Sequence, residues 1–312
     1  MSILIFTELA DGKFKKSSLE AISYGSKVDG SAPVVLAIGE AGEDSLAEAG
    51  QFGASKVIYS PQNQENIMVY SQALLQAIES TGAIIVVSVK SALADAVMAR
   101  AAGTLKAALI GNVTELPDTS NGFVVKNSIF SGKAFAKTEM KSEVKFLQIK
   151  KNVVEAIPQT GSAVVETVNF ATDNMGSKVI DTQKASGQLS LPEADIVVSG
   201  GRGMKGPEHW QPLLDLAQAL GAATGCSKPV SDLDWRPHHE HVGQTGVKVA
   251  PNLYIACGIS GAIQHLAGVN SSKVIVVINK DPEAPFFKAA DYGIVGDVFE
   301  VLPKLTEAAK LL

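Results

Sequence analysis

Cysteine and surplus charge are both scarce in this sequence, and each shortage excludes a class of protein. Cys226 and Cys257 are the only cysteines among the 312 residues, too few for a disulfide framework or a four-cysteine metal site. The 27 basic and 32 acidic side chains leave a net charge of −5, so the chain lacks the basic surplus that a nucleic acid backbone attracts. We expect buried, reduced thiols and no nucleic acid partner.

Long apolar runs are missing as well. No run approaches the roughly 18 residues that a membrane-spanning helix needs, and residues 1–8 lack the basic start of a secretion signal. We therefore expect a cytoplasmic protein that is not embedded in a membrane. With 46% hydrophobic and 19% charged residues, the composition excludes disorder, and the length predicts two domains of roughly 150 residues each.

The first half alternates short β-branched runs with amphipathic windows, an order that predicts α/β structure with parallel strands. The expected strands are residues 3–6, 34–38, 57–59 and 84–89, and the expected helices are residues 66–81 and 91–105. Three later runs, 123–125, 145–149 and 163–167, have no helical window between them, which favours antiparallel strands. The polar, turn-rich stretch 171–194 predicts a linker.

The second half restarts the α/β pattern and predicts a doubly wound parallel sheet. The expected strands are residues 195–199, 253–257, 273–278 and 292–295, with helices over 207–220 and 301–311. We expect an N-terminal α/β domain with some antiparallel strands over residues 1–190 and a ligand-binding domain over 191–312. Open doubly wound sheets bind ligands beyond the carboxyl ends of their strands, so the residues after each strand are the candidates.

A glycine-rich loop follows the first of these strands. Gly201, Gly203 and Gly206 fit the pattern G-x-G-x-x-G between strand and helix, which lets a backbone approach a pyrophosphate. We favour phosphate binding over a plain tight turn. A nicotinamide site also needs an acidic residue about 20 positions on, where this chain has Thr224–Lys228. A hydroxyl and a cation suit a phosphate or a flavin ring better, and an NAD-dependent dehydrogenase is the alternative.

Three further segments carry polar chemistry. Trp235–His241 holds three of the five histidines without metal-site spacing, which favours a solvated loop or one histidine facing a ligand. Val242–Gly246 is either a ligand-contacting turn or an ordinary one. Gly258–Ala262 departs from a G-x-S-x-G nucleophile elbow at Ala262 and lacks a partner histidine, so it favours backbone N–H groups directed at a phosphate or ring carbonyl.

Polar residues also follow the last two strands. Asn279 and Asp297, each taken alone, are typical of turn caps. Four successive strand ends with ligand-type residues nevertheless predict one shared site, because the carboxyl ends of parallel strands lie at one edge of the sheet.

The run Val242–Gly246, the run Val249–Gly268 and the run Ile278–Pro285 with Ala290–Gly293 behind it closely resemble the α subunit of electron transfer flavoprotein. The similarity extends from about Asp195 to Pro303, whereas the first 190 residues agree in layout more than in motif. The resemblance implies an electron carrier rather than a conventional enzyme: a heterodimer with a β subunit, in which the second domain holds most of one FAD and the flavin ring lies at the subunit junction.

The resemblance further implies a route for the electrons. Soluble flavin dehydrogenases, such as the acyl-CoA dehydrogenases of fatty acid β-oxidation, donate electrons, and a membrane quinone oxidoreductase accepts them. Some relatives instead bifurcate electrons from NADH. The first domain would serve as a scaffold for the partner subunit.

Residue roles follow from the same resemblance. Arg202 would approach the FAD pyrophosphate, Ser227 and Lys228 would border the ring, and Gln244 and Thr245 would bond it, with the threonine hydroxyl directed to N5. The segment 260–265 would hold pyrophosphate and ring, with its last residue near the flavin O2, and the residues after the last two strands would bind the adenosine side. The implied cofactor-binding set, without catalytic or metal-binding residues, is Arg202, Ser227, Lys228, His241, Val242, Gly243, Gln244, Thr245, Ser260, Gly261, Ala262, Ile263, Gln264, His265, Asn279, Asp297 and Val298.

Two positions depart from the family's usual pattern. Lys228 stands where arginine is usual and keeps the charge but not the planar guanidinium that can stack on a ring. His241 stands where glutamine is usual, and an imidazole, unlike an amide, changes charge near neutral pH.

Overall fold

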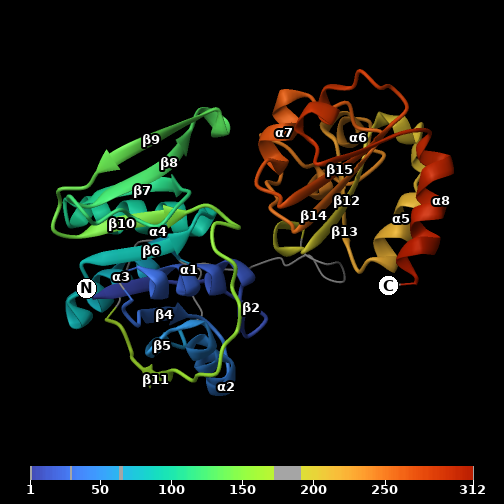
Figure 1. The fold of residues 1–312 in the computed structure, drawn as a ribbon. Coiled ribbons are helices and arrows are strands. Elements are labelled where there is room, and N and C mark those ends of the chain that lie inside the picture. The colour runs from blue at the N-terminus through green and yellow to red at the C-terminus, as the bar shows by residue number, and fades with distance from the viewer. Residues whose placement is uncertain (1, 29, 63–65, 172–190, 312) are drawn as a thin grey trace. The chain divides into compact units, whose positions relative to one another are not determined.

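The computed structural model describes residues 2–28, 30–62, 66–171 and 191–311. The chain forms two compact units, Met1–Gln183 and Lys184–Leu312 (Figure 1). Most of the linker predicted over 171–194 lies outside the described residues. Within those residues, no helix combines the length and the apolar character needed to cross a membrane.

The first unit is built on a nine-stranded sheet in the order β11-β5-β4-β1-β6-β10-β7-β8-β9. Strands β11 to β7 of this order are parallel, and β8 and β9 add antiparallel at one edge. The strands are β1 (Ile3–Phe6), β4 (Val34–Ile38), β5 (Lys56–Ser60), β6 (Ile85–Val89), β7 (Ala108–Val113), β8 (Val124–Ile129), β9 (Ala134–Glu139), β10 (Lys145–Ile149) and β11 (Val164–Thr167), with a separate hairpin of β2 (Leu9–Ala10) and β3 (Lys13–Phe14).

Helices cover both faces of this sheet. Helix α1 (Lys16–Lys27) packs with α2 (Glu43–Ala47) and η1 (Glu48–Phe52) on one apolar cluster, and α3 (Ile67–Thr81) packs with α4 (Ala92–Thr104) on another. The expected helix starts are confirmed, because the side chains of Asn66 and Ser91 accept the N–H groups of Met68 and Ala94. Expected strands 3–6 and 34–38 match β1 and β4.

Two of the expected antiparallel strands are wrong. β10 lies between β6 and β7 and is parallel to both, and β11 pairs parallel with β5. In β10, Phe146, Leu147 and Ile149 are all fully buried, as in a parallel strand covered on both faces. The antiparallel expectation is confirmed only for the run at 123–125, which overlaps the start of β8; its antiparallel neighbour β9 is not among the expected strands.

The second unit has the doubly wound parallel sheet that its sequence predicts. Its order is β13-β12-β14-β15-β16, and every pairing is parallel. The strands are β12 (Ile196–Gly200), β13 (Ala223–Cys226), β14 (Leu253–Cys257), β15 (Val274–Asn279) and β16 (Tyr292–Val295). The short strand β13 is absent from the sequence-based prediction, because Ala-Thr-Gly-Cys contains no long β-branched run.

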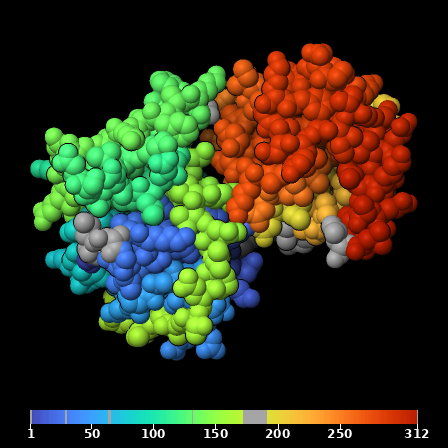
Figure 2. Space-filling model, in the orientation of Figure 1, coloured from blue at the N-terminus to red at the C-terminus, as the bar shows by residue number. Residues whose placement is uncertain are grey.

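Helices again cover both faces. Helices α5 (Gln211–Ala219) and α8 (Val298–Ala309) pack side by side on one face, and α7 (Ile263–Val269) packs on the other (Figure 1). The red α8 end of the chain forms part of the surface of this unit (Figure 2). The short helix α6 (Lys228–Asp232) follows β13.

Two helix boundaries differ from expectation. The helix expected over 207–220 is broken into η5 (Pro207–His209) and α5, with Trp210 between them. Pro212 has no N–H to continue the helical hydrogen bonds from the preceding turn, so α5 starts anew at Gln211. The Trp210 indole packs on the end of β12, where a Cβ at Gly200 would come within 2.5 Å of it. The last helix starts at residue 298 rather than 301, because Asp297 caps it.

Candidate functional site

The strand order of the second sheet defines the position where its connections change direction. The chain goes from β12 to β13 at one edge, then from β14 through β15 to β16 at the other. Doubly wound sheets of this order bind ligands beyond the carboxyl ends of the strands at that switch point. The loops after β12 and β14, which begin at Gly201 and Gly258, therefore form the first part of the candidate site.

These two loops touch backbone to backbone. The N–H of Gly201 donates to the Cys257 carbonyl at 2.9 Å, and the N–H of Gly203 donates to the Gly258 carbonyl at 3.0 Å. A Cβ at Gly203 would lie 2.6 Å from the Gly258 Cα, and Gly258 itself has φ +62°. The glycines are required for this crossing of loops, a contact that the sequence pattern alone does not reveal.

The glycine loop does not open a helix directly, so the predicted strand–loop–helix fingerprint is wrong in its last step. η4 (Arg202–Met204) lies within the loop, and η5 and Trp210 separate Gly206 from α5. A Cβ at Gly206 would meet only the end of the flexible Glu208 side chain, at 2.4 Å, and the backbone there is extended, so this position does not need glycine as Gly203 does.

Positive charge lies beside the start of α8. The Lys205 ammonium lies 3.6 Å from the Asp297 carboxylate and 4.7 Å from the centroid of the Phe299 ring. The Asp297 side chain accepts the Phe299 N–H at 3.0 Å; this hydrogen bond, and then Lys205, lower the pKa of the carboxyl group. Arg202 is exposed on the same loop, and Val298 is buried in the first turn of α8.

Asn279 ties the end of β15 to the loop after β14. Its amide donates to the Ile259 carbonyl at 3.1 Å, and its side-chain oxygen accepts the Asp281 N–H at 3.1 Å. The turn-capping alternative considered for this residue and for Asp297 is therefore confirmed for both. In the same loop, Gly261 has φ +84°.

The turn Gly243–Gly246 is attached to the start of α7. The Gln244 N–H donates to the Gln264 carbonyl at 2.8 Å, and the Gly243 N–H donates to the Val247 carbonyl at 3.1 Å. The side chains of Gln244 and Thr245 are exposed, whereas Val242 before them is fully buried. The turn therefore presents an amide and a hydroxyl from a fixed backbone.

The start of α7 supplies exposed groups next to this turn. Ser260, Ala262 and Gln264 are exposed, and Ile263 is 68% exposed, unusual for a large apolar side chain held beside polar groups. His265 differs from these residues: it is buried, and its Nε2 shares a 2.9 Å hydrogen bond with the Tyr254 hydroxyl. Burial lowers the pKa of His265 to about 4, although the nearby Val242 backbone opposes the shift.

Helix α6 adds a charged pair. The Lys228 ammonium donates to the Asp232 carboxylate at 3.0 Å, and both side chains are more than half exposed. Ser227, which precedes the helix, is buried. Lys228 lowers and Asp232 raises the pKa of His241, so these three residues lie in one electrostatic neighbourhood with the turn that follows His241.

One buried ring nitrogen here, Nδ1 of His241, has no hydrogen-bond partner within the described chain. Buried polar atoms are normally satisfied, so an unpaired one is expected where a ligand or water completes the site. Together with the exposed amide and hydroxyl of Gln244 and Thr245, this nitrogen fits a flat, polar heterocycle such as a flavin.

The sequence interpretation missed several residues that support this region. Tyr254 is fully buried beneath His265, and no motif identified it. Arg236 donates two hydrogen bonds to the buried Glu240 carboxylate, one from Nε at 2.9 Å and a shorter one from Nη2. The i,i+4 spacing of these two residues is the sequence feature that could have indicated the pair. The solvated-loop alternative is wrong for Glu240 and His241, which are both buried.

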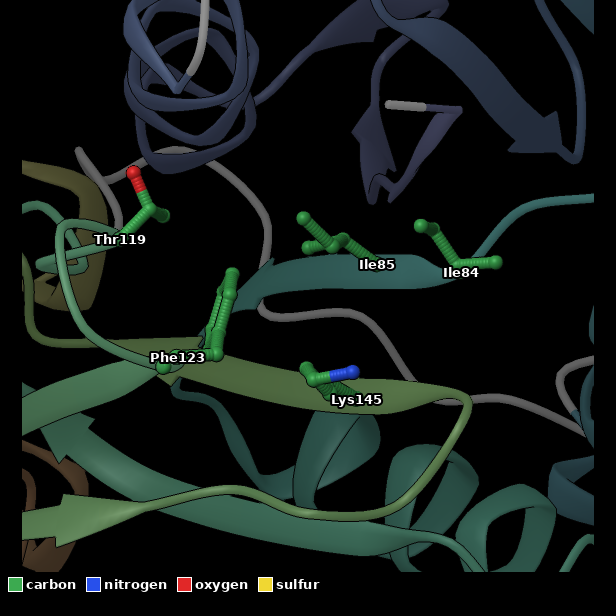
Figure 3. A pocket seen from close by; sticks show the side chains of 6 residues that line it. Ile84, Ile85, Thr119, Phe123 and Lys145 are labelled. Atoms are coloured by element: carbon green, nitrogen blue, oxygen red, sulfur yellow. The ribbon is translucent and has the colours of Figure 1, made fainter.

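Other candidates are weaker. Among the described residues, no three histidine, cysteine or acidic side chains lie together as a metal site would require. A cavity of about 220 Å³ in the first unit is lined by Ile84, Ile85, Thr119, Gly122, Phe123 and Lys145 (Figure 3). It lies where β6 and β10 begin, and the Lys145 ammonium already donates to the Ser142 and Glu143 carbonyls.

Sheet order, crossing glycine loops and neighbouring polar groups define a doubly wound unit whose candidate ligand site lies at the carboxyl ends of its strands. Residues 190–270 match the family described as the electron transfer flavoprotein FAD-binding domain, and residues 3–173 match the electron transfer flavoprotein domain. The chain therefore belongs to the electron transfer flavoprotein α subunit family.

Relatives extend over nearly the whole chain. The chain is 38% identical to the electron transfer flavoprotein subunit alpha of Bacillus subtilis (strain 168), over 99% of this chain and 98% of that protein. It is 36% identical to the subunits alpha of Pseudomonas aeruginosa and Paracoccus denitrificans, covering 99% and 98% of this chain and 100% and 99% of theirs. The resemblance found in the sequence is confirmed, and with it an electron transfer flavoprotein role; the FAD-binding family match points to flavin binding.

Proposed function

We propose that the second unit binds one FAD non-covalently and that the chain works as the α subunit of a heterodimer with a β subunit. The observation that carries the proposal is that the Gly243–Gly246 turn, the start of α7 and helix α6 lie around the buried imidazole of His241, whose Nδ1 is unpaired within the described chain. The FAD-binding family match over residues 190–270 supports it. FAD supplies the electron chemistry, and the chain supplies binding and electrostatics.

The residues are assigned by their place around the switch point. Arg202 and the N–H groups of residues 260–264 would hold the pyrophosphate. The turn residues Gln244 and Thr245 would bond the flavin ring, with Ser227 and Lys228 at its border and His265 near O2. Asn279 and Asp297 already hold their own turns. They would contact the adenosine side through the hydrogen-bonding positions that these turns leave free.

The partners follow from the same reading. Flavin dehydrogenases such as acyl-CoA dehydrogenases would donate electrons in the cytoplasm, and a quinone oxidoreductase would accept them. The β subunit would cover the exposed side of the ring and would also bury Ile263, which is 68% exposed in this chain. The first unit would act as the scaffold on which the β subunit assembles.

One comparison tests the cofactor and its shared site. The chain is expressed alone and with its β subunit, and the flavin retained after gel filtration is measured and identified as FAD or another flavin. We expect about one FAD per heterodimer and much less in the isolated chain, because a ring at a subunit junction loses part of its walls. Equal retention in both preparations would contradict a shared site.

The nicotinamide alternative has no structural support. The position after β13, where the ribose carboxylate of a dinucleotide fold is expected, carries Ser227 and Lys228. NADH added to the same preparations serves as the control, and no protection against thermal unfolding by NADH is expected.

A further inference from the structure

His241 lies inside the turn that presents Gln244 and Thr245. Its side chain is only 3% exposed, and its carbonyl accepts the Val247 N–H at 2.7 Å. A Cβ at Gly246 would lie 2.7 Å from Nδ1 of this imidazole, and a Cβ at Gly243 would lie 3.2 Å from its Nε2. The two glycines therefore close the turn directly around the ring, so the position of the turn depends on what fills it.

The enclosed ring carries a nitrogen that the protein does not use. Nδ1 of His241 is buried without a hydrogen-bond partner in the described chain. A turn that needed only filling would be better served by an apolar side chain, because an unpaired buried nitrogen is unfavourable. The imidazole is therefore placed for a role beyond packing.

Charged and titratable groups face His241 from each neighbouring element. Its ring lies 5.7 Å from that of His238 in η6 (His238–Glu240), and α6 contributes Lys228 and Asp232. His265 lies near it in α7. Burial is the largest cause that lowers the pKa of His241; His238 and Lys228 lower it further, and Asp232 raises it.

The remaining titratable neighbours, Cys226 and Glu240, supply no free negative charge that would favour a protonated His241. The Cys226 thiol at the end of β13 is kept protonated because burial raises its pKa to about 12. The Glu240 carboxylate is held by Arg236. The imidazole is therefore neutral near neutral pH, and new negative charge against the turn favours its protonation.

We propose that His241 is a proton-coupled positioning residue: its imidazole holds the Gly243–Gly246 turn against the flavin and takes up one proton when the flavin is reduced. The inference rests on the proposed function. A bound FAD reduced by two electrons from the donor flavin would take one proton from solvent, and His241 would take a second proton from solvent at its free nitrogen. No bond in the protein breaks, and reoxidation by the acceptor releases both protons.

The coupling is tested by the pH dependence of the two-electron reduction potential in the heterodimer with FAD. One additional proton per two electrons changes the equilibrium tenfold per pH unit, which is about 30 mV per unit. We expect this extra slope in the wild type, between the lowered pKa of His241 with oxidised flavin and its higher value with reduced flavin. His241→Gln should lose the slope, and the exposed His239→Gln control should keep it. Equal slopes in all three proteins would overturn the proposal.

Positioning is tested by affinity. His241→Gln still fills the turn and should bind FAD within about threefold of the wild type, whereas His241→Ala should bind at least tenfold more weakly at unchanged elution volume. Equal affinity for Ala and wild type would overturn the positioning role. NMR of the flavin-free protein provides a second readout, an imidazole that titrates below its ordinary pKa and is missing from His241→Gln. A wild-type heterodimer without flavin would refute the proposed function itself, whereas a flavin-loaded one with unchanged slopes refutes only this inference.

Discussion

The Tyr254 hydroxyl and Nε2 of His265 lie 2.9 Å apart inside the second unit, where both side chains are buried. Tyr254 belongs to the middle of the sheet on β14, and His265 to the helix whose start carries proposed flavin contacts. The His265 ring also packs edge-on against Phe286 at 5.7 Å. Burial raises the pKa of Tyr254 above its usual range and lowers that of His265, so the pair is neutral near neutral pH and fixes α7 to the sheet.

Tyr254→Phe should lower the free energy of unfolding by about 1–3 kcal/mol, because it leaves Nε2 of His265 buried without a partner. Urea denaturation of the full chain measures the change. Tyr292→Phe is the matched control, since Tyr292 is 67% exposed and should change stability very little. Equal effects of the two variants would show that the buried hydrogen bond contributes nothing.

The His265 pKa makes stability depend on pH. Its folded value of about 4 lies below the ordinary value near 6.5, so the unfolded chain binds the proton more readily. The stabilisation is complete above about pH 6.5 and is lost as the pH falls toward 4, by up to about 3 kcal/mol. His265→Gln should remove this part of the pH dependence.

Unfolding of wild type and His265→Gln is therefore compared at several pH values between 4 and 7. The difference between them isolates His265 from the carboxyl groups that titrate in the same range. Parallel stability curves would contradict the buried, neutral histidine.

The partly buried pair Arg236–Glu240 predicts a larger loss. Glu240 is 1% exposed and the Arg236 side chain 19% exposed, so Glu240→Gln leaves a partly buried guanidinium without its counter-charge and should cost about 2 kcal/mol or more. Asp232→Asn breaks the exposed Lys228–Asp232 pair and should cost less than about 1 kcal/mol. Thermal unfolding of both variants measures the contrast, and losses of similar size would refute it.

Local features of the sequence predict most of the helices and strands, but fewer of the pairings between strands. β14 and β16 match the expected bounds because each is an apolar run ended by a turn. The parallel pairing of β10 could not be predicted, because it depends on β6 and β7, which lie about 40 or more residues earlier. The contact of the Trp210 indole with Gly200 is likewise a tertiary one that the local sequence does not reveal.

The same limit applies to the site. Glycines at 201 and 203 are visible in the sequence, but their reason, contact with Gly258, is a tertiary one. The enclosure of His241 by Gly243 and Gly246 is local and could be suspected from the motif, whereas Tyr254 under His265 could not. The roles of the individual residues toward FAD stay predictions that the following variants test.

Substitutions of Lys228 test the effect of its charge separately from any effect on packing. Its ammonium is exposed and, within the described part of the chain, pairs with Asp232, so Lys228→Ala should leave stability within about 0.5 kcal/mol of the wild type. If Lys228 borders the ring, losing its positive charge should lower the flavin reduction potential, and Lys228→Arg should raise it. Spectroelectrochemical titration of the three heterodimers measures this, and coincident potentials would place Lys228 away from the ring.

The crossing of the two glycine loops gives the sharpest steric prediction. In Gly203→Ala, the new methyl group would lie 2.6 Å from the Cα of Gly258, and backbone, unlike a flexible side chain, cannot move aside cheaply. We expect a loss of about 2 kcal/mol or more in stability, together with weaker FAD binding, because the loops at the switch point must separate. Gly103→Ala is the matched control: nothing lies within 4 Å of its Cβ position, and alanine favours the helix, so stability should stay level or rise by up to about 1 kcal/mol. Chemical denaturation and flavin fluorescence on both variants measure the two effects. A Gly203→Ala protein as stable and as tightly flavin-binding as Gly103→Ala would show that the loops do not need to touch.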